Sequence, residues 1–470
     1  MKRINIFLFL LAGICFPFKL SAQDYDIRFK IHGLHDTVCL LANYYGSGTY
    51  IKDTLKVDAS GKFSYHAPAG FPRGVYIIVL NDKNFFELII NNDRKFSMET
   101  ERGNLIGAMK ITSSPENKLF YEYMEYNRVR YGDLQKLQNR LKTSGKKDSA
   151  DMEGQIRDIN KDIIRYKLDM AQKNPSSFMA FMIHAMQEPE VPEAPVLPNG
   201  RRDSTFFYKY FKAHFWDGTD FTDDRLLRTP VFSTKLTRYF DQILIQNTDT
   251  LIKECDRLIA LSKPNSDMFK YMVWFMTSHY ETSEIMGFDR IFVHIIDTYY
   301  ATGQATWVNR TVLENILRKA NRIRPLLIGE TAPNMIMLDT NNHLVSMNSI
   351  VSRYLILLFW DPDCGHCEQE LPKLKSIYDR LKETMGLEIF AVCSDSSMVK
   401  WKNAIIKKKM SWINVDGPRT ITGDYHELYD ITTTPVIYIL NEKKQIIAKN
   451  LPVERIEDFL QNFERLKKGR

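Results

Sequence analysis

Two cysteines separated by two residues are the feature of this sequence that is best suited to chemistry. Cys364 and Cys367 enclose Gly365-His366 and follow an almost entirely apolar run, Tyr354 to Trp360. Such a run is expected of a central strand buried on both faces, and Asp361-Pro362-Asp363 would end it, so that the cysteines open a helix. A sulfur at a helix N-terminus meets unsatisfied backbone N–H groups and the positive end of the helix dipole, which favour thiolate over thiol. The spacing therefore predicts a disulfide-exchanging dithiol, with Cys364 as the nucleophile and Cys367 as the resolving thiol.

The same spacing also occurs as half of a zinc site, which needs a second pair of thiols or imidazoles at similar spacing. Cys393 is isolated, and the ten histidines are scattered from His32 to His426 without ligand spacing. We therefore expect no metal and no bound cofactor.

The sequence downstream of the motif alternates between strand and helix patterns. Leu387 to Cys393 is typical of a second buried strand, Met398 to Lys409 of an amphipathic helix, and Thr432 to Ile439 of a strand that begins with proline. From about Gly329 onward the chain resembles the thioredoxin superfamily, specifically the TlpA/ResA-like thiol-disulfide oxidoreductases. The resemblance covers roughly the last 140 residues and is carried by Phe359-Trp360, the cysteine motif, Glu370-Leu371-Pro372, Asp416-Gly417 and Thr434-Pro435.

This resemblance implies roles for individual residues around the dithiol. Thr434-Pro435 is similar to the cis-proline loop beside the active-site disulfide, where the Thr434 backbone would pair with an extended substrate and Pro435 would keep metals off the thiols. Glu370 matches an acidic residue near the cysteines that would tune their pKa or relay a proton, although a solvated helix carboxylate is the alternative. Trp360 resembles the aromatic residue that flanks the site and contacts substrate, and a plain core aromatic is its alternative.

Two positions depart from the pattern of thioredoxin itself. Leu358 stands where thioredoxin keeps a buried aspartate, so proton handling would depend on Glu370, water or His366. His366 replaces the proline that is common in cytoplasmic reductants, and a partly cationic imidazole beside the Cys364 thiolate favours the reduced form, which makes the couple more oxidising. Asp361 and Asp363 add negative charge nearby and oppose this effect.

The N-terminus predicts export. Lys2-Arg3 is followed by an apolar run from Ile4 to Phe16 and by Ser21-Ala22, which together are typical of a cleavable signal peptide at residues 1–22. A membrane anchor is the alternative, but the run is shorter than the roughly 20 residues needed to span a bilayer. Lipid attachment at Cys15 is disfavoured because Ile14 occupies a position that requires a small residue. We therefore expect a protein of the bacterial periplasm.

Composition is compatible with this compartment and excludes little else. The chain has 470 residues, 44% of them hydrophobic, which is enough for about three domains. The formal charge of +7 falls to +4 when Lys2, Arg3 and Lys19 leave with the signal peptide, so nothing indicates a nucleic-acid partner. We interpret the cysteines outside the signal peptide and the motif, which are Cys39, Cys255 and Cys393, as inert core thiols. A disulfide between Cys39 and Cys255 is the alternative.

The segments before the thioredoxin-like region predict two accessory domains. In residues 23–112, Ile27, Phe29 and Ile31 alternate with charged residues, and the pattern predicts a small antiparallel β-sandwich. Residues 113–325 predict an all-α region that starts at Ser114-Pro115, and its first two helices would pair near Ser144-Gly145. A dimerising coiled coil is the alternative use of the same apolar stripes. An α/β thioredoxin fold follows in residues 326–470.

Three functions compete on these grounds. The first is an extracytoplasmic oxidoreductase that reduces or isomerises disulfides of envelope proteins and is reset by a membrane thiol-reductant donor. The second is a client-binding scaffold with a vestigial thioredoxin module, against which stands the retention of both cysteines, Pro435 and Glu370. The third is a peroxidase like the peroxiredoxins, which place threonine three residues before the reacting cysteine, where this chain has Asp361. The sequence does not decide the oligomeric state.

Overall fold

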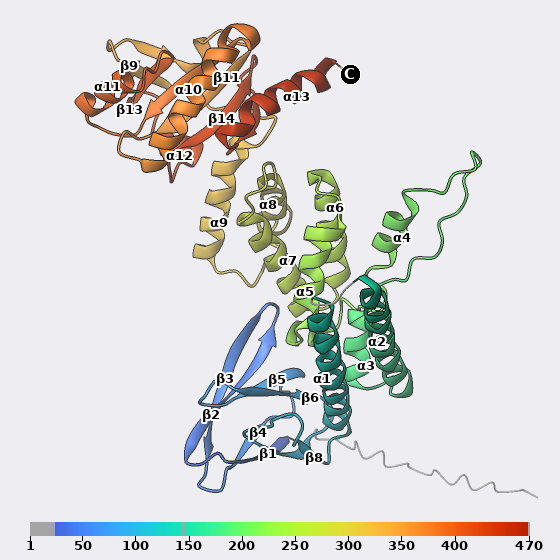
Figure 1. The fold of residues 1–470 in the computed structure, drawn as a ribbon. Helices are drawn as coiled ribbons and strands as arrows, with labels where there is room; N and C mark the ends of the chain where they lie inside the picture. Colours follow the sequence, from blue (N-terminus) through green and yellow to red (C-terminus); the bar gives the residue numbers. More distant parts are fainter. Residues whose placement is uncertain (1–23, 143–145, 469–470) are drawn as a thin grey trace, which may run out of the picture. The chain divides into compact units, whose positions relative to one another are not determined.

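The structure, a computed structural model, describes residues 24–142 and 146–468. The described chain forms two compact units that meet in sequence between Ile243 and Leu244, and Figure 1 follows the elements from the blue N-terminal strands to the red C-terminal helices. The division falls inside the region expected to be one helical domain, so both units contain part of it. The predicted signal peptide and the predicted helix junction at Ser144-Gly145 lie outside the described residues and stay predictions.

The N-terminal unit begins with eight strands in two four-stranded sheets, ordered β4-β1-β7-β8 and β3-β2-β5-β6. Ile27, Phe29 and Ile31 of β1 are buried, as their period-two spacing predicted. Neighbouring strands are antiparallel except β1 and β7, which run parallel, a pairing that alternation alone does not predict. The strands are β1 (Tyr25–His32), β2 (Thr37–Tyr45), β3 (Gly48–Val57), β4 (Lys62–Ala67), β5 (Gly74–Val79), β6 (Phe85–Ile90), β7 (Lys95–Glu101) and β8 (Lys110–Thr112).

Helices complete the N-terminal unit. The Ser114 side chain accepts the N–H of Asn117, and Pro115 is the first residue of the first helix, as predicted. The first two helices pack against each other, with the rings of Tyr126 and Tyr166 stacked at 3.7 Å between centroids. The helices are α1 (Pro115–Leu141), α2 (Lys146–Lys173), α3 (Phe178–Met186), α4 (Phe206–His214) and α5 (Val231–Arg238), with short turns η1 (Asp224–Arg228) and η2 (Tyr239–Ile243).

The C-terminal unit opens with four more helices. Asn247, Asn265 and Asn309 cap three of them by accepting backbone N–H groups, which explains where these helices start. The segment between the second and third of these helices, residues 282–288, is called the α7–α8 loop below. The helices are α6 (Thr248–Ser262), α7 (Ser266–Glu281), α8 (Asp289–Ile295) and α9 (Arg310–Ile323), with short turns η3 (Ile296–Tyr300) and η4 (Arg324–Leu326).

The rest of the C-terminal unit is a mixed α/β domain around one seven-stranded sheet, ordered β10-β9-β13-β12-β11-β14-β15. The strands are β9 (Ile336–Asp339), β10 (Leu344–Ser346), β11 (Tyr354–Trp360), β12 (Leu387–Cys393), β13 (Ile413–Thr420), β14 (Val436–Asn441) and β15 (Ile446–Lys449). The helices are α10 (Gly365–Met385), α11 (Met398–Lys407), α12 (Tyr425–Tyr429) and α13 (Ile456–Lys468), with short turns η5 (Met347–Ser349) and η6 (Val453–Arg455).

The central strand β11 is buried on both faces, which explains its continuous apolar run. It pairs in parallel with β12 and antiparallel with β14. Ile356 and Leu358 point to the face where α10, α11 and α13 pack, whereas Leu357 and Phe359 point to the opposite face, together with residues of α12. The expected thioredoxin-like fold is therefore observed, and its central strand has the predicted bounds.

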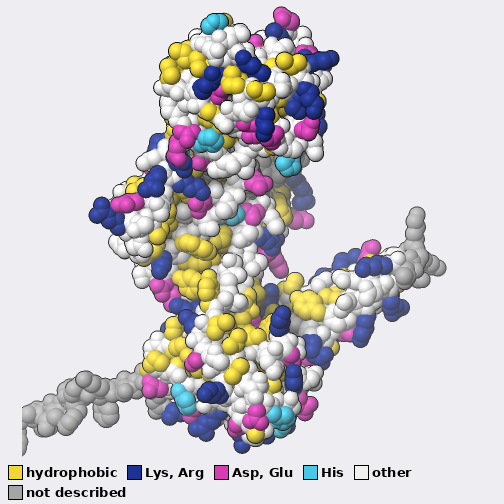
Figure 2. All heavy atoms as spheres, turned by 90° about the vertical axis from the view of Figure 1, so that its left-hand side faces the viewer, with side chains coloured by type: hydrophobic (Ala, Val, Ile, Leu, Met, Phe, Trp, Pro, Cys, Tyr) yellow, Lys and Arg dark blue, Asp and Glu magenta, His cyan; other side chains and the backbone are white. Residues whose placement is uncertain are grey.

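Within the described residues, no helix combines the length and the apolar character that crossing a membrane requires. On the face shown in Figure 2, the lysine and arginine side chains of the C-terminal domain, in the upper part of the view, are interspersed with aspartate and glutamate.

Candidate active site

A tight turn after β11 delivers the cysteine motif to a helix start. The carbonyl oxygen of Asp361 accepts the N–H of Cys364 at 3.3 Å, and its side chain accepts the N–H of Asp363 at 2.8 Å. Cys364 is the N-cap of α10, with extended backbone angles, and its Sγ accepts the N–H of Cys367 at 3.3 Å. The sulfur thus occupies the position that a serine or aspartate oxygen takes at other helix starts.

The loop before β14 reaches Cys364 because β14 is the antiparallel neighbour of β11. The register of the two strands places Val436 opposite Phe359, one residue before the end of β11. The Thr434–Pro435 peptide bond is cis. The Cys364 thiol donates to the carbonyl oxygen of Thr434 at 3.2 Å. The structure therefore brings together Cys364, Thr434 and Pro435, as the resemblance implied.

The surroundings make the two thiols of the motif unequal. Partial burial by itself raises the pKa of Cys364, but the hydrogen bonds around its sulfur, with Thr434, Cys367 and the backbone of His366, outweigh burial and lower the pKa from its ordinary value. Backbone N–H donors at the start of a helix are the groups that stabilise a thiolate. Cys367 is 0% exposed, and burial raises its pKa to about 12. Cys364 is therefore the thiol of the pair that ionises first.

Three carboxylates gather beside the motif. Oxygens of Asp361, Asp363 and Asp395 lie within 4.8 Å of one another. Ser394 donates to Asp361 at 2.6 Å, and the ammonium group of Lys400 on α11 lies 2.6 Å from Asp363 and 3.8 Å from Asp395. The sequence analysis expected Asp361 and Asp363 to oppose the effect of His366 on the redox couple. Lys400, which it did not identify, offsets part of their negative charge.

His366 and Glu370 lie on the first turns of α10 and line a cavity of about 800 Å³. His366 is exposed, whereas Glu370 is partly buried and accepts a hydrogen bond from Lys373 at 2.7 Å. Lys373 also lies 2.5 Å from Glu454. Glu370 is thus a member of an ion-pair network at the rim of the site, and its influence on the thiols stays a prediction.

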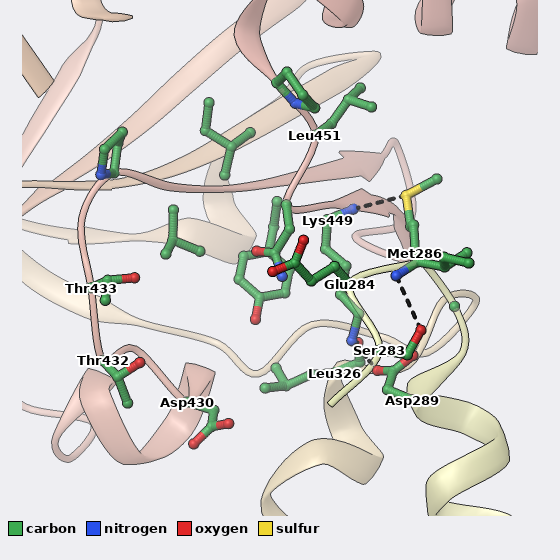
Figure 3. A pocket seen from close by; sticks show the side chains of 18 of the residues that line it. Ser283, Glu284, Met286, Asp289, Leu326, Asp430, Thr432, Thr433, Lys449 and Leu451 are labelled. Atoms are coloured by element: carbon green, nitrogen blue, oxygen red, sulfur yellow. Dashed lines mark hydrogen bonds and ion pairs between the residues drawn. The ribbon is translucent and has the colours of Figure 1, made fainter. Parts of the chain in front are cut away.

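The other wall of this cavity comes from the α7–α8 loop, far earlier in the sequence. Figure 3 shows Thr432 and Thr433, from the loop before β14, on one side of the cavity and Glu284 and Met286 on the other. The sequence analysis assigned no role to this loop. Nothing in its local pattern indicates that it lies beside the dithiol, because only tertiary packing brings the two segments together.

The burial of Trp360 and Leu358 bears on two statements of the sequence analysis. Trp360 is 0% exposed and belongs to the core that α10 covers, so its side chain is not available to a client, and the alternative role of core aromatic applies. Leu358 is 1% exposed in the same core, which leaves no ionisable group at that position. Among the residues that the structure describes, the cysteines outside the motif, Cys39, Cys255 and Cys393, are buried free thiols.

Comparison with protein families divides the chain into three matched segments. Residues 328–449 match the AhpC/TSA family, and two domains of unknown function precede it, DUF4369 at residues 25–120 and DUF5106 at residues 144–322. Together these segments cover most of the chain, in the order β-rich, helical and thioredoxin-like.

Individual relatives each match part of the chain. The thiol-disulfide oxidoreductase ResA of Bacillus cereus is 25% identical over 140 residues, which are 29% of this chain and 78% of the relative. A crystal structure of a domain of a possible thiol-disulfide isomerase from Cytophaga hutchinsonii is 36% identical, covering 31% of this chain and 99% of that one, with a TM-score of 0.29. A thioredoxin-like protein from Bacteroides caccae covers 58% of this chain and 99% of its own at 18% identity, with a TM-score of 0.46.

Proposed function

We propose that this chain, which carries a C-terminal AhpC/TSA thioredoxin-like domain related to the ResA-like thiol-disulfide oxidoreductases, reduces or isomerises protein disulfides through Cys364 and Cys367. One observation carries the proposal: a half-buried thiol caps a helix, accepts the N–H of its partner cysteine at 3.3 Å and lies 3.2 Å from the carbonyl of a loop that ends in cis-proline. Such a thiol has the lowered pKa and the access that exchange requires.

The chemistry proceeds in two exchanges. The Cys364 thiolate attacks one sulfur of a client disulfide, the client S–S bond breaks, and the departing client thiolate takes up a proton. Cys367 then gives up its own proton and attacks the sulfur of Cys364, which forms the Cys364–Cys367 disulfide and releases the client as a dithiol. Two electrons pass to the client with two protons, one matching that lost by Cys364 on ionisation and one from Cys367. In isomerisation, a client thiol displaces Cys364 instead, with no net transfer of electrons.

The surrounding residues would support these steps. The backbone of Thr434 would pair with an extended client segment, next to Pro435. His366 and Glu370, on the exposed side of the motif, would take up and return protons together with water. In reductive turnover, an electron donor, which we propose to be a membrane thiol protein, restores the dithiol.

We propose that the protein acts in the periplasm, a compartment where disulfides form and persist. The predicted signal peptide at residues 1–22 supports this proposal, and disulfide-containing envelope proteins would be the clients.

A trapping experiment tests the function. Replacement of the resolving thiol in Cys367→Ala leaves the mixed disulfide without an internal attacker, so we expect covalent complexes with client proteins on non-reducing gels. Cys364→Ala lacks the nucleophile and serves as the matched control, in which no complexes should form. Complexes that accumulate in Cys364→Ala, or in neither variant, would contradict the assigned roles. Rapid peroxide consumption by the reduced native chain in stopped flow would favour the peroxidase alternative.

A further inference from the structure

The cavity beside the dithiol is large enough to hold part of a client. Its volume of about 800 Å³ lies within the range of ligand sites, and His366 and Pro435 lie on its dithiol side. A client segment paired with the Thr434 backbone would therefore continue into this cavity on at least one side of its cysteine.

The second wall of the cavity, the α7–α8 loop, is held at both ends. At its start, Glu281 lies 2.8 Å from Lys319 of α9. At its end, Asp289 receives a hydrogen bond from the ammonium group of Lys449 on β15, a lysine that is only 9% exposed and also donates to the carbonyl oxygen of Leu326 at 2.8 Å. These contacts tie the start of the loop to α9 and its end to β15, so the cavity has two defined walls.

The loop presents apolar surface together with a carboxylate. Ile285 and Met286 are 54% and 40% exposed and line the cavity, with Leu451 among the other lining residues. Figure 3 shows the Glu284 side chain lying within the space enclosed by the labelled residues. Apolar side chains and one charge aimed into a shared space are typical of a site that recognises a peptide side chain with a long stem and a charged end.

The charges that line the cavity are unbalanced toward negative. Six carboxylates and two lysines line it. Five of the carboxylates have a cationic partner: Glu281 has Lys319, Asp289 has Lys449, Glu370 and Glu454 share Lys373, and Asp430 lies near Arg322. Among the residues that the structure describes, Glu284 is exposed and has neither an ion-pair nor a hydrogen-bond partner. This local excess differs from the mixed charges on the face of the domain shown in Figure 2.

We infer that the α7–α8 loop forms one wall of the client-binding cleft and that Glu284 selects client segments with a lysine or arginine next to the target disulfide. This inference rests on the proposed function, because the cleft selects clients only if Cys364 attacks them. The stem of the client's basic residue packs against Ile285 and Met286, and its charged end meets Glu284.

The test uses the full chain and two synthetic peptides, each closed by an internal disulfide and identical except for lysine or glutamate beside the first cysteine. At low ionic strength we expect the second-order rate constant for reduction by the reduced native chain to be about fivefold higher for the lysine peptide, the size of one exposed ion pair, and the preference to shrink at high salt. Glu284→Gln should lose most of the preference. Glu383→Gln, which neutralises an exposed carboxylate of α10 outside the cavity, should keep it.

A small neutral disulfide separates failure of this inference from failure of the proposed function. If the native chain does not reduce that compound, the proposed function fails. If it reduces the compound but treats both peptides alike, or if Glu383→Gln loses as much preference as Glu284→Gln, the selection by Glu284 is overturned. A preference that Glu284→Gln loses and Glu383→Gln keeps supports the inference.

Discussion

Two buried lysines, Lys235 in the N-terminal unit and Lys449 in the C-terminal unit, have different partners. In the N-terminal unit, the ammonium group of Lys235 donates to the carbonyl oxygens of Ala185 at 2.8 Å and Gln187 at 3.0 Å, and burial lowers the pKa of Lys235 to about 8. In the C-terminal unit, Lys449 meets the carboxylate of Asp289. Burial lowers the pKa of Lys235 because desolvation disfavours the charged form, even though two carbonyl oxygens accept its hydrogen bonds, whereas Lys449 has a partner of opposite charge.

Two cysteines, Cys39 of the N-terminal unit and Cys364 of the C-terminal unit, also differ. Cys39 lies inside β2 and is 0% exposed, and burial raises its pKa to about 11. Cys364 lies just beyond the end of β11, at a helix start, and its pKa is lowered. The same type of side chain therefore has a different pKa at these two positions, so the fold decides which thiol can do chemistry.

The largest expected difference is between the reactivities of Cys364 and Cys39, and alkylation tests it. In the reduced native chain, iodoacetamide should modify Cys364 more than 100-fold faster than Cys39 near neutral pH, because at least two pKa units separate their thiolate fractions and Cys39 is buried. The rate at Cys364 should reach half its maximum below pH 9.0. Peptide mass spectrometry distinguishes the sites, with Cys364→Ser as the control. Equal labelling of both thiols under native conditions would remove the contrast.

Removal of the ammonium group of Lys449 should produce the next largest effect, a loss of stability. Lys449→Met leaves Asp289 partly buried without its cation, which should destabilise the C-terminal unit by about 3 kcal/mol. Hydrogen exchange of peptides around α8 and β15 would measure this loss locally.

Two further variants make the stability test specific. Lys443→Met, in the exposed turn before β15, is the matched control and should change little. Adding Asp289→Leu to Lys449→Met should restore most of the loss, because an apolar pair leaves no unpaired charge. If Lys449→Met exchanges like Lys443→Met, the ion pair does not hold the two segments together.

The structure also shows which features could be predicted from the sequence alone. The apolar run of β11 and the cysteines after it predicted the strand, the helix start and the order of the two thiols, because each depends on neighbouring residues. Thr434-Pro435 was placed through family resemblance. The parallel pairing of β1 with β7, the position of Lys400 and the cavity wall around Glu284 depend on contacts between distant segments, which leave no local pattern. For Trp360 the sequence left substrate contact and core packing open, because an aromatic residue at a strand end suits a surface or a core equally well, and its side chain is buried.

The third test concerns Lys235 and pH, and within one pH unit its effect is smaller than the loss expected of Lys449→Met. Between about pH 8 and 10.5, folded Lys235 has lost its proton while the unfolded chain keeps it, so the unfolded state binds more protons and stability rises with pH. The native chain should therefore gain up to about 1.4 kcal/mol per pH unit relative to Lys235→Met in this window.

Hydrogen exchange of peptides around α3 and α5 would measure this pH dependence, with Lys209→Met on the exposed side of α4 as the control. A constant difference between native chain and Lys235→Met from pH 8 to 10.5 would show that Lys235 is not titrating there.

The ion pair between Lys449 and Asp289 joins two sequence families. Asp289 belongs to the DUF5106 segment, and Lys449 is the last residue of the AhpC/TSA segment. A chimera that takes one of these segments from a relative must therefore keep both charged partners or replace both, because replacing only one would leave the other buried charge unpaired. In this chain, the two segments are thus constrained to change together at this point, although they match separate families.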